Sequence, residues 1–121
     1  MITTRVPVES NRSEVESLLE RVWMLTEHEA LRLDAAWSRC AGGDVSRWQS
    51  QAYTTARGAW GDAWADVWAE ALEAWGDGPA GAWWAIADAL VAVATSELIP
   101  AERFDALYRP WKEVVDVGTR G

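Results

Sequence analysis

Apolar and polar residues over positions 46–75 recur with the period of an α-helix. Trp60, Trp64, Trp68 and Trp75 lie within about 80° of arc when each residue turns the helix by about 100°. We call these four tryptophans the aromatic ridge. The opposite arc, which we call the acidic face, carries five carboxylates: Asp62, Asp66, Glu70, Glu73 and Asp77. The pattern predicts one long amphipathic helix over residues 46–75, which Gly58 and Gly61 weaken and could bend.

The same periodicity predicts an all-α fold of about five helices packed around a tryptophan-rich core. The helices are expected over residues 13–25, 27–41, 46–75, 80–97 and 101–116. Capping-box spacing between Ser13 and Glu16, and again between Thr26 and Glu29, marks the starts of the first two helices. Residues 80–97 are apolar over most of the helical circumference, which predicts the most buried helix.

One domain is expected, because a chain of 121 residues suits a single hydrophobic core. Residues 11–117 form this predicted domain, between a flexible lead at 1–10 and a frayed tail at 118–121. Pro110 cannot continue a helix comfortably, so a separate last turn is expected from Trp111. No alternation of apolar and polar residues predicts a strand.

The negative charge of the chain is concentrated in its middle third. Residues 58–102 contain eight acidic residues and no lysine or arginine, while the whole chain has a net charge of −8. Such a surface repels phosphate backbones, so we expect no nucleic-acid partner. It would attract a basic partner, although a strongly charged exterior also keeps an aromatic-rich domain soluble.

The sequence shows no targeting segment and no membrane span. Residues 1–10 lack the apolar run of a signal peptide. Residues 78–96, the least charged stretch, are rich in alanine and interrupted by Asp88. Cys40 is the only cysteine, so an intrachain disulfide is excluded. These features predict a cytoplasmic protein without a membrane partner.

No constellation of residues predicts a reaction, a metal site or a cofactor site. His28, the only histidine, lies between Glu27 and Glu29, and neighbouring residues on a helix point in different directions. Cys40 lies on an apolar stripe, far along its helix from the histidine that could activate it. The glycines around Pro79 come without the lysine of a phosphate-binding loop. We therefore expect a protein that is not an enzyme.

Two tryptophans do not follow the apolar stripes of their predicted helices. Trp84 lies about 100° away from the stripe that contains Trp83. Trp48 lies opposite the aromatic ridge if residues 46–75 form one helix. A large exposed ring near acidic residues is typical of a contact site. The first hypothesis is therefore protein–protein interaction through the acidic face, Trp84 and Trp48, with a basic protein or a second copy as the partner and a homodimer favoured.

A small-ligand site is the alternative hypothesis. The tryptophan-rich core could enclose a pocket for a flat or cationic apolar molecule. Its predicted lining residues are Trp64, Trp68, Trp75, Trp83 and Tyr108. A cavity on the order of several hundred Å³ would favour this hypothesis. A closed core with an exposed Trp84 would favour protein interaction.

The C-terminal third contains a segment of the form L-I-x-x-x-x-F-D-x-L-Y-x-P-W. Its matching residues are Leu98, Ile99, Phe104, Asp105, Leu107, Tyr108, Pro110 and Trp111. Together with the alanine- and tryptophan-rich repeat before it, the segment resembles small helical proteins of high-GC Gram-positive bacteria. The resemblance covers residues 56–115 and implies a helical fold, but it implies no activity and no functional residue.

Overall fold

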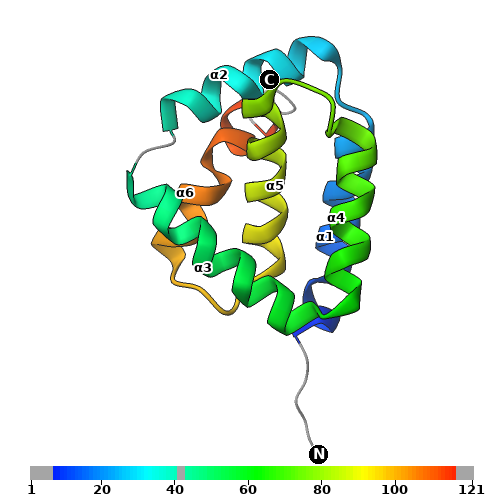
Figure 1. The fold of residues 1–121 in the computed structure, drawn as a ribbon, viewed down its shortest axis with the longest axis vertical. Helices are drawn as coiled ribbons and strands as arrows, with labels where there is room; N and C mark the ends of the chain where they lie inside the picture. Colours follow the sequence, from blue (N-terminus) through cyan, green and yellow to red (C-terminus); the bar gives the residue numbers. More distant parts are fainter. Residues whose placement is uncertain (1–6, 41–42, 117–121) are drawn as a thin grey trace, which may run out of the picture.

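Helix α5 (Ala80–Ala94) runs through the middle of the structure, a computed structural model in which five other helices surround it (Figure 1). The structure describes residues 7–40 and 43–116, with the side chains of residues 12–40 and 48–115. The surrounding helices are α1 (Pro7–Trp23), α2 (Glu27–Cys40), α3 (Gly43–Trp60), α4 (Asp62–Trp75) and α6 (Ala101–Trp111). A π-helical turn, Lys112–Asp116, follows α6. No strand occurs within these residues, which confirms the all-α prediction and raises the helix count to six.

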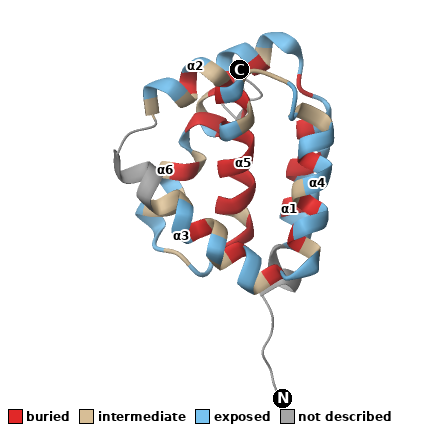
Figure 2. Ribbon diagram, in the orientation of Figure 1, coloured by how far each residue is buried: buried red, intermediate tan, exposed pale blue. Residues whose placement is uncertain are grey.

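The small residues of α5 explain its central position. Ala82, Ala85 and Ala89 are completely buried, so the neighbouring helices approach the α5 backbone closely. At the start of α5, a side chain at Gly81 would collide with the backbone of Asp34 in α2. The Gly81 N–H instead donates a 2.8 Å hydrogen bond to the Asp34 carboxylate. Figure 2 shows buried positions along most of α5, which confirms the expected burial of this helix.

The single long helix predicted over residues 46–75 is wrong, because the chain breaks into α3 and α4 at Gly61. Gly61 has a φ of 57°, in the left-handed region that glycine adopts at little cost. The two helices leave this residue in different directions and both contact α5 (Figure 1). The Trp60 indole N–H secures the corner by donating a 3.1 Å hydrogen bond to the Ala94 carbonyl.

The N-terminal boundary also differs from the prediction. α1 begins at Pro7, where the fixed φ of proline suits a first helical turn. Residues 7–10 are therefore helical rather than part of a flexible lead, and Ser13 lies inside α1 rather than at its start. The second predicted start is confirmed. The Glu29 N–H donates to the Thr26 hydroxyl at 3.1 Å and the Thr26 N–H donates to the Glu29 carboxylate at 3.0 Å, as in a capping box.

At the C-terminal end, α6 continues through Pro110 and ends at Trp111. The backbone then widens into the π-helical turn, so the predicted separate last turn exists but begins after Trp111. Residues 1–6 and the predicted tail at 118–121 lie outside the described residues. Along the described chain, no helix combines the length and the apolar character needed to cross a membrane.

Tryptophans form a large part of the core, as expected. Trp60, Trp64 and Trp111 are buried, and Trp68 and Trp75 pack half-buried against the same core. The rings of Trp60 and Trp64 meet edge to face with their centres 6.4 Å apart, and the next ring, Trp68, lies 6.1 Å from Trp64. The aromatic ridge therefore faces inward, while the acidic face points to solvent.

Candidate functional site

A groove with a volume of about 560 Å³ lies where α2 begins and α4 ends, and we call it the acidic groove. Its lining residues are Glu27, Ala30, Leu31, Glu73, Ala74, Trp75, Asp77, Gly78 and Pro79. All three carboxylates are exposed, and none of them forms an ion pair with any side chain that the structure describes. The acidic groove thus combines an apolar surface with uncompensated negative charge.

A hydrogen bond fixes one wall of the acidic groove. The Trp75 indole N–H donates a 2.9 Å hydrogen bond to the Val22 carbonyl, which holds the ring as one wall. Beside the groove, Arg21 donates a 2.7 Å hydrogen bond to Glu29, and this bond lowers the pKa of the Glu29 carboxyl. Leu31 remains 60% exposed at the rim although it is apolar. The nearby arginine is therefore occupied, and an apolar side chain is left open to solvent.

The acidic face is exposed along its whole length, but only its C-terminal end reaches the acidic groove. Asp62 and Asp66 lie on the first turns of α4 and do not line the groove. Glu70 accepts a 3.0 Å hydrogen bond from the indole N–H of Trp23, whose ring remains exposed at the end of α1. The last two acids, Glu73 and Asp77, line the groove. The structure therefore separates a groove-lining end of the acidic face from an end that is only exposed to solvent.

A second concavity, of about 490 Å³, lies between α3 and α4 and reaches the start of α5, and we call it the aromatic cleft. Its lining residues are Tyr53, Arg57, Gly61, Trp64, Ala65, Trp68, Ala69, Leu72 and Trp84. Tyr53 meets the Trp68 ring edge to face at 5.5 Å. The Trp83 ring supports the Trp68 ring at 5.2 Å without lining the cleft itself.

The residues of the predicted ligand pocket do not gather in one place. Trp64 and Trp68 line the aromatic cleft, and Trp83 touches Trp68 from the core. Trp75 forms a wall of the acidic groove instead. Tyr108 lies in a third concavity between α1 and α6. Trp75 lies two helical turns beyond Trp68 on α4, roughly 10 Å along the axis, and Tyr108 belongs to a different helix, α6, so these side chains do not face one cavity.

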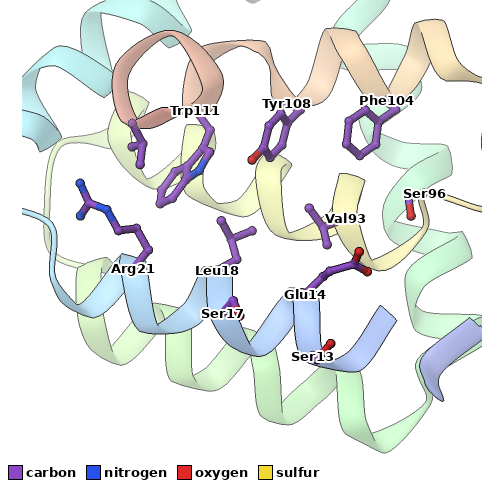
Figure 3. Close-up of a pocket in the computed structure, with 11 residues that line it drawn as sticks. Ser13, Glu14, Ser17, Leu18, Arg21, Val93, Ser96, Phe104, Tyr108 and Trp111 are labelled. Carbon is purple, nitrogen blue, oxygen red and sulfur yellow. The ribbon is translucent and has the colours of Figure 1, made fainter. Parts of the chain in front are cut away.

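Figure 3 shows the third concavity, an open groove of about 750 Å³ between α1 and α6. Phe104, Tyr108 and Trp111 extend from α6 toward α1, and the Phe104 and Tyr108 rings stack with their centres 5.2 Å apart. Arg21 lines the same groove but is held by Glu29. The aromatic residues of the F-D-x-L-Y-x-P-W segment thus form one wall of this groove.

The structure also reveals a buried carboxylate that the sequence analysis treated only as an interruption. Asp88 lies in the middle of α5 and is 1% exposed. It accepts hydrogen bonds from three side chains: the Trp37 indole N–H at 3.2 Å, the Gln49 amide at 2.7 and 3.0 Å, and the Tyr53 hydroxyl at 2.8 Å. Burial raises the pKa of Asp88, because desolvation outweighs these hydrogen bonds. A lone acid within an apolar helix was the signal that could have identified this network.

The remaining predicted residues lie as follows. Trp84 is 36% exposed, and its ring stacks on Trp37 with the ring centres 6.5 Å apart. Trp48 is half-buried, and the Arg103 guanidinium lies 5.8 Å from its ring centre. Neither ring lines the acidic groove. His28 is exposed. Burial raises the pKa of the half-buried Cys40 thiol.

Within the described residues, no three histidine, cysteine or acidic side chains are grouped as a metal site would require. Comparison of the chain with protein-family models, curated proteins and solved structures finds no match.

Proposed function

We propose that this protein is not an enzyme and acts through protein–protein interaction, with the acidic groove binding a basic, partly apolar segment of the partner. The proposal rests on one observation. Three exposed carboxylates, Glu27, Glu73 and Asp77, surround an apolar floor, and no described side chain neutralises them with an ion pair.

A lysine or arginine side chain matches both parts of the acidic groove. Its aliphatic stem would cover Leu31 and the face of Trp75, which removes apolar surface from water. Its charged head would then lie among the carboxylates, and the electron-rich face of an indole also attracts a cation. Neighbouring apolar residues of the partner would cover the exposed Trp23 ring at the end of α1.

Charge beyond the groove supports the same class of partner. Within residues 58–102, which contain no lysine or arginine, five exposed acids lie outside the groove: Asp62, Asp66, Glu70, Glu97 and Glu102. The net charge of the chain is −8. A field of one sign accelerates the encounter with an oppositely charged partner and repels acidic ones. Binding at the acidic groove should therefore be fast at low salt and should weaken as salt is added.

Charge reversal within the acidic groove tests this proposal. The variant Glu73→Lys/Asp77→Lys should bind a short peptide of alternating lysine and leucine at least about tenfold more weakly than the wild type, with a flatter salt dependence. The matched control, Asp62→Lys/Asp66→Lys, carries the same charge change at the start of α4, away from the groove. We expect it to lose less than about threefold. Isothermal titration calorimetry at two salt concentrations measures both variants.

Equal losses in the two variants would mean that the peptide senses only net charge, and the groove would then have no specific role.

The same pair of variants tests the homodimer. Light scattering at high micromolar concentration should give a dimer for the wild type and for the Asp62→Lys/Asp66→Lys control if the partner is a second copy. The Glu73→Lys/Asp77→Lys variant should then be a monomer. A monomeric wild type would exclude a second copy as the partner, and the groove would then bind a different protein.

A further inference from the structure

The aromatic cleft presents an apolar surface that the fold itself does not cover. Leu72 of α4 is 44% exposed and Trp84 of α5 is 36% exposed, and both side chains line this one concavity. The opposite wall is made by Tyr53 and Trp68, which meet edge to face. Its volume of about 490 Å³ lies within the range of small-molecule pockets, roughly 300–1,000 Å³.

Arg57 gives the aromatic cleft a charge opposite in sign to the net charge of the chain. It is the only charged residue in the described lining of the cleft. Its guanidinium makes no ion pair with a described carboxylate. In the sequence it is the last basic residue before Arg103. A cation so placed at an aromatic cavity, in a chain of net charge −8, favours a ligand that carries a negative group.

Both walls of the aromatic cleft are held in place by the same buried carboxylate. The Tyr53 hydroxyl donates a 2.8 Å hydrogen bond to Asp88, and Tyr53 in turn meets Trp68. The Trp37 indole N–H also donates to Asp88, at 3.2 Å, and the Trp37 ring stacks on Trp84. The rings that a ligand would touch are therefore fixed before it arrives, which lowers the entropic cost of binding.

We propose that the aromatic cleft binds a planar aromatic anion. The ring system lies against Trp68 and Trp84, Leu72 covers its edge, and its carboxylate or sulfonate accepts hydrogen bonds from the Arg57 guanidinium. This site is separate from the acidic groove, since the two share no lining residue. The protein therefore carries a ligand site in addition to its proposed partner site.

Three naphthalene derivatives test the charge requirement: 2-naphthoate, neutral 2-naphthamide and cationic 2-naphthylmethylammonium. Quenching of tryptophan fluorescence, checked by calorimetry, gives each dissociation constant. We expect 2-naphthoate to bind at least about tenfold more tightly than the other two. Arg57→Gln should remove this preference, and Trp84→Ala should weaken the binding of all three compounds.

Arg32→Gln is the matched control, because Arg32 is an exposed arginine of α2 that does not line the cleft. It should leave binding of 2-naphthoate unchanged. Thermal melts of the Arg57→Gln variant should match the wild type, since the side chain is exposed. The proposal is overturned if 2-naphthoate shows no saturable binding at millimolar concentration, or if Arg57→Gln binds it as tightly as Arg32→Gln does.

Discussion

Replacing Asp88 with alanine is expected to lower the free energy of unfolding by about 2–4 kcal/mol. The substitution leaves three side-chain donors, on Trp37, Gln49 and Tyr53, facing an apolar space without an acceptor. Denaturant unfolding followed by circular dichroism measures the change. Asp66→Ala, on the exposed acidic face, is the control and should stay within about 0.5 kcal/mol of the wild type. Equal effects of the two substitutions would show that the Asp88 network contributes nothing to stability.

The loss at Asp88 should depend on pH in a defined direction. Burial raises the pKa of this carboxyl in the folded protein above its unfolded value. For a carboxyl whose pKa is raised by folding, the contribution to stability is complete at pH values below the pKa of the unfolded state. This contribution decreases as the pH rises through the pKa of the folded state. The difference in unfolding free energy between wild type and Asp88→Ala should therefore be larger in acid than at neutral pH. A difference that grows toward neutral pH would contradict the raised pKa.

Truncation of the buried Trp64 is expected to cost about 3–5 kcal/mol, as other large aromatic truncations in cores do. Its side chain is 6% exposed and contacts the rings of Trp60 and Trp68. Thermal and denaturant melts of Trp64→Ala give the value. Trp23→Ala removes an exposed indole instead and should change stability by about 1 kcal/mol or less. A change at Trp64 below about 1 kcal/mol would mean that the aromatic ridge does not face the core.

The helices could be predicted from the sequence because their apolar period is unambiguous. Thr26 and Glu29 form the capping box that their spacing indicates. Gly58 and Gly61 indicated a weak point in the long helix, but the full break at Gly61 escaped prediction for a physical reason. Trp60 and Trp64 both face the core on either side of it, so the apolar stripe continues in phase across the bend. Periodicity reports which face of a helix is buried, but it does not report a change in the direction of the axis.

The candidate sites were predictable only in part. Two of the three acids that line the acidic groove, Glu73 and Asp77, follow from helical spacing, because exposed faces are local features. Leu31 lines the groove only because the start of α2 lies near the end of α4, and this arrangement is tertiary rather than local. The hydrogen-bond network of Asp88 was not predicted, because acids are seldom buried and its donors lie on two other helices. Such networks become visible only when the packing is known.

The acidic groove is tested most directly by nuclear magnetic resonance of the ¹⁵N-labelled protein titrated with the alternating lysine–leucine peptide. We predict saturable shifts of the Trp75 indole signal and of the backbone amides at residues 27–31 and 73–78. The Trp64 and Trp84 indole signals of the aromatic cleft should not move. A matched glutamate–leucine peptide should cause no shifts. Shifts confined to the aromatic cleft or to the groove between α1 and α6, or equal responses to both peptides, would contradict the proposed function.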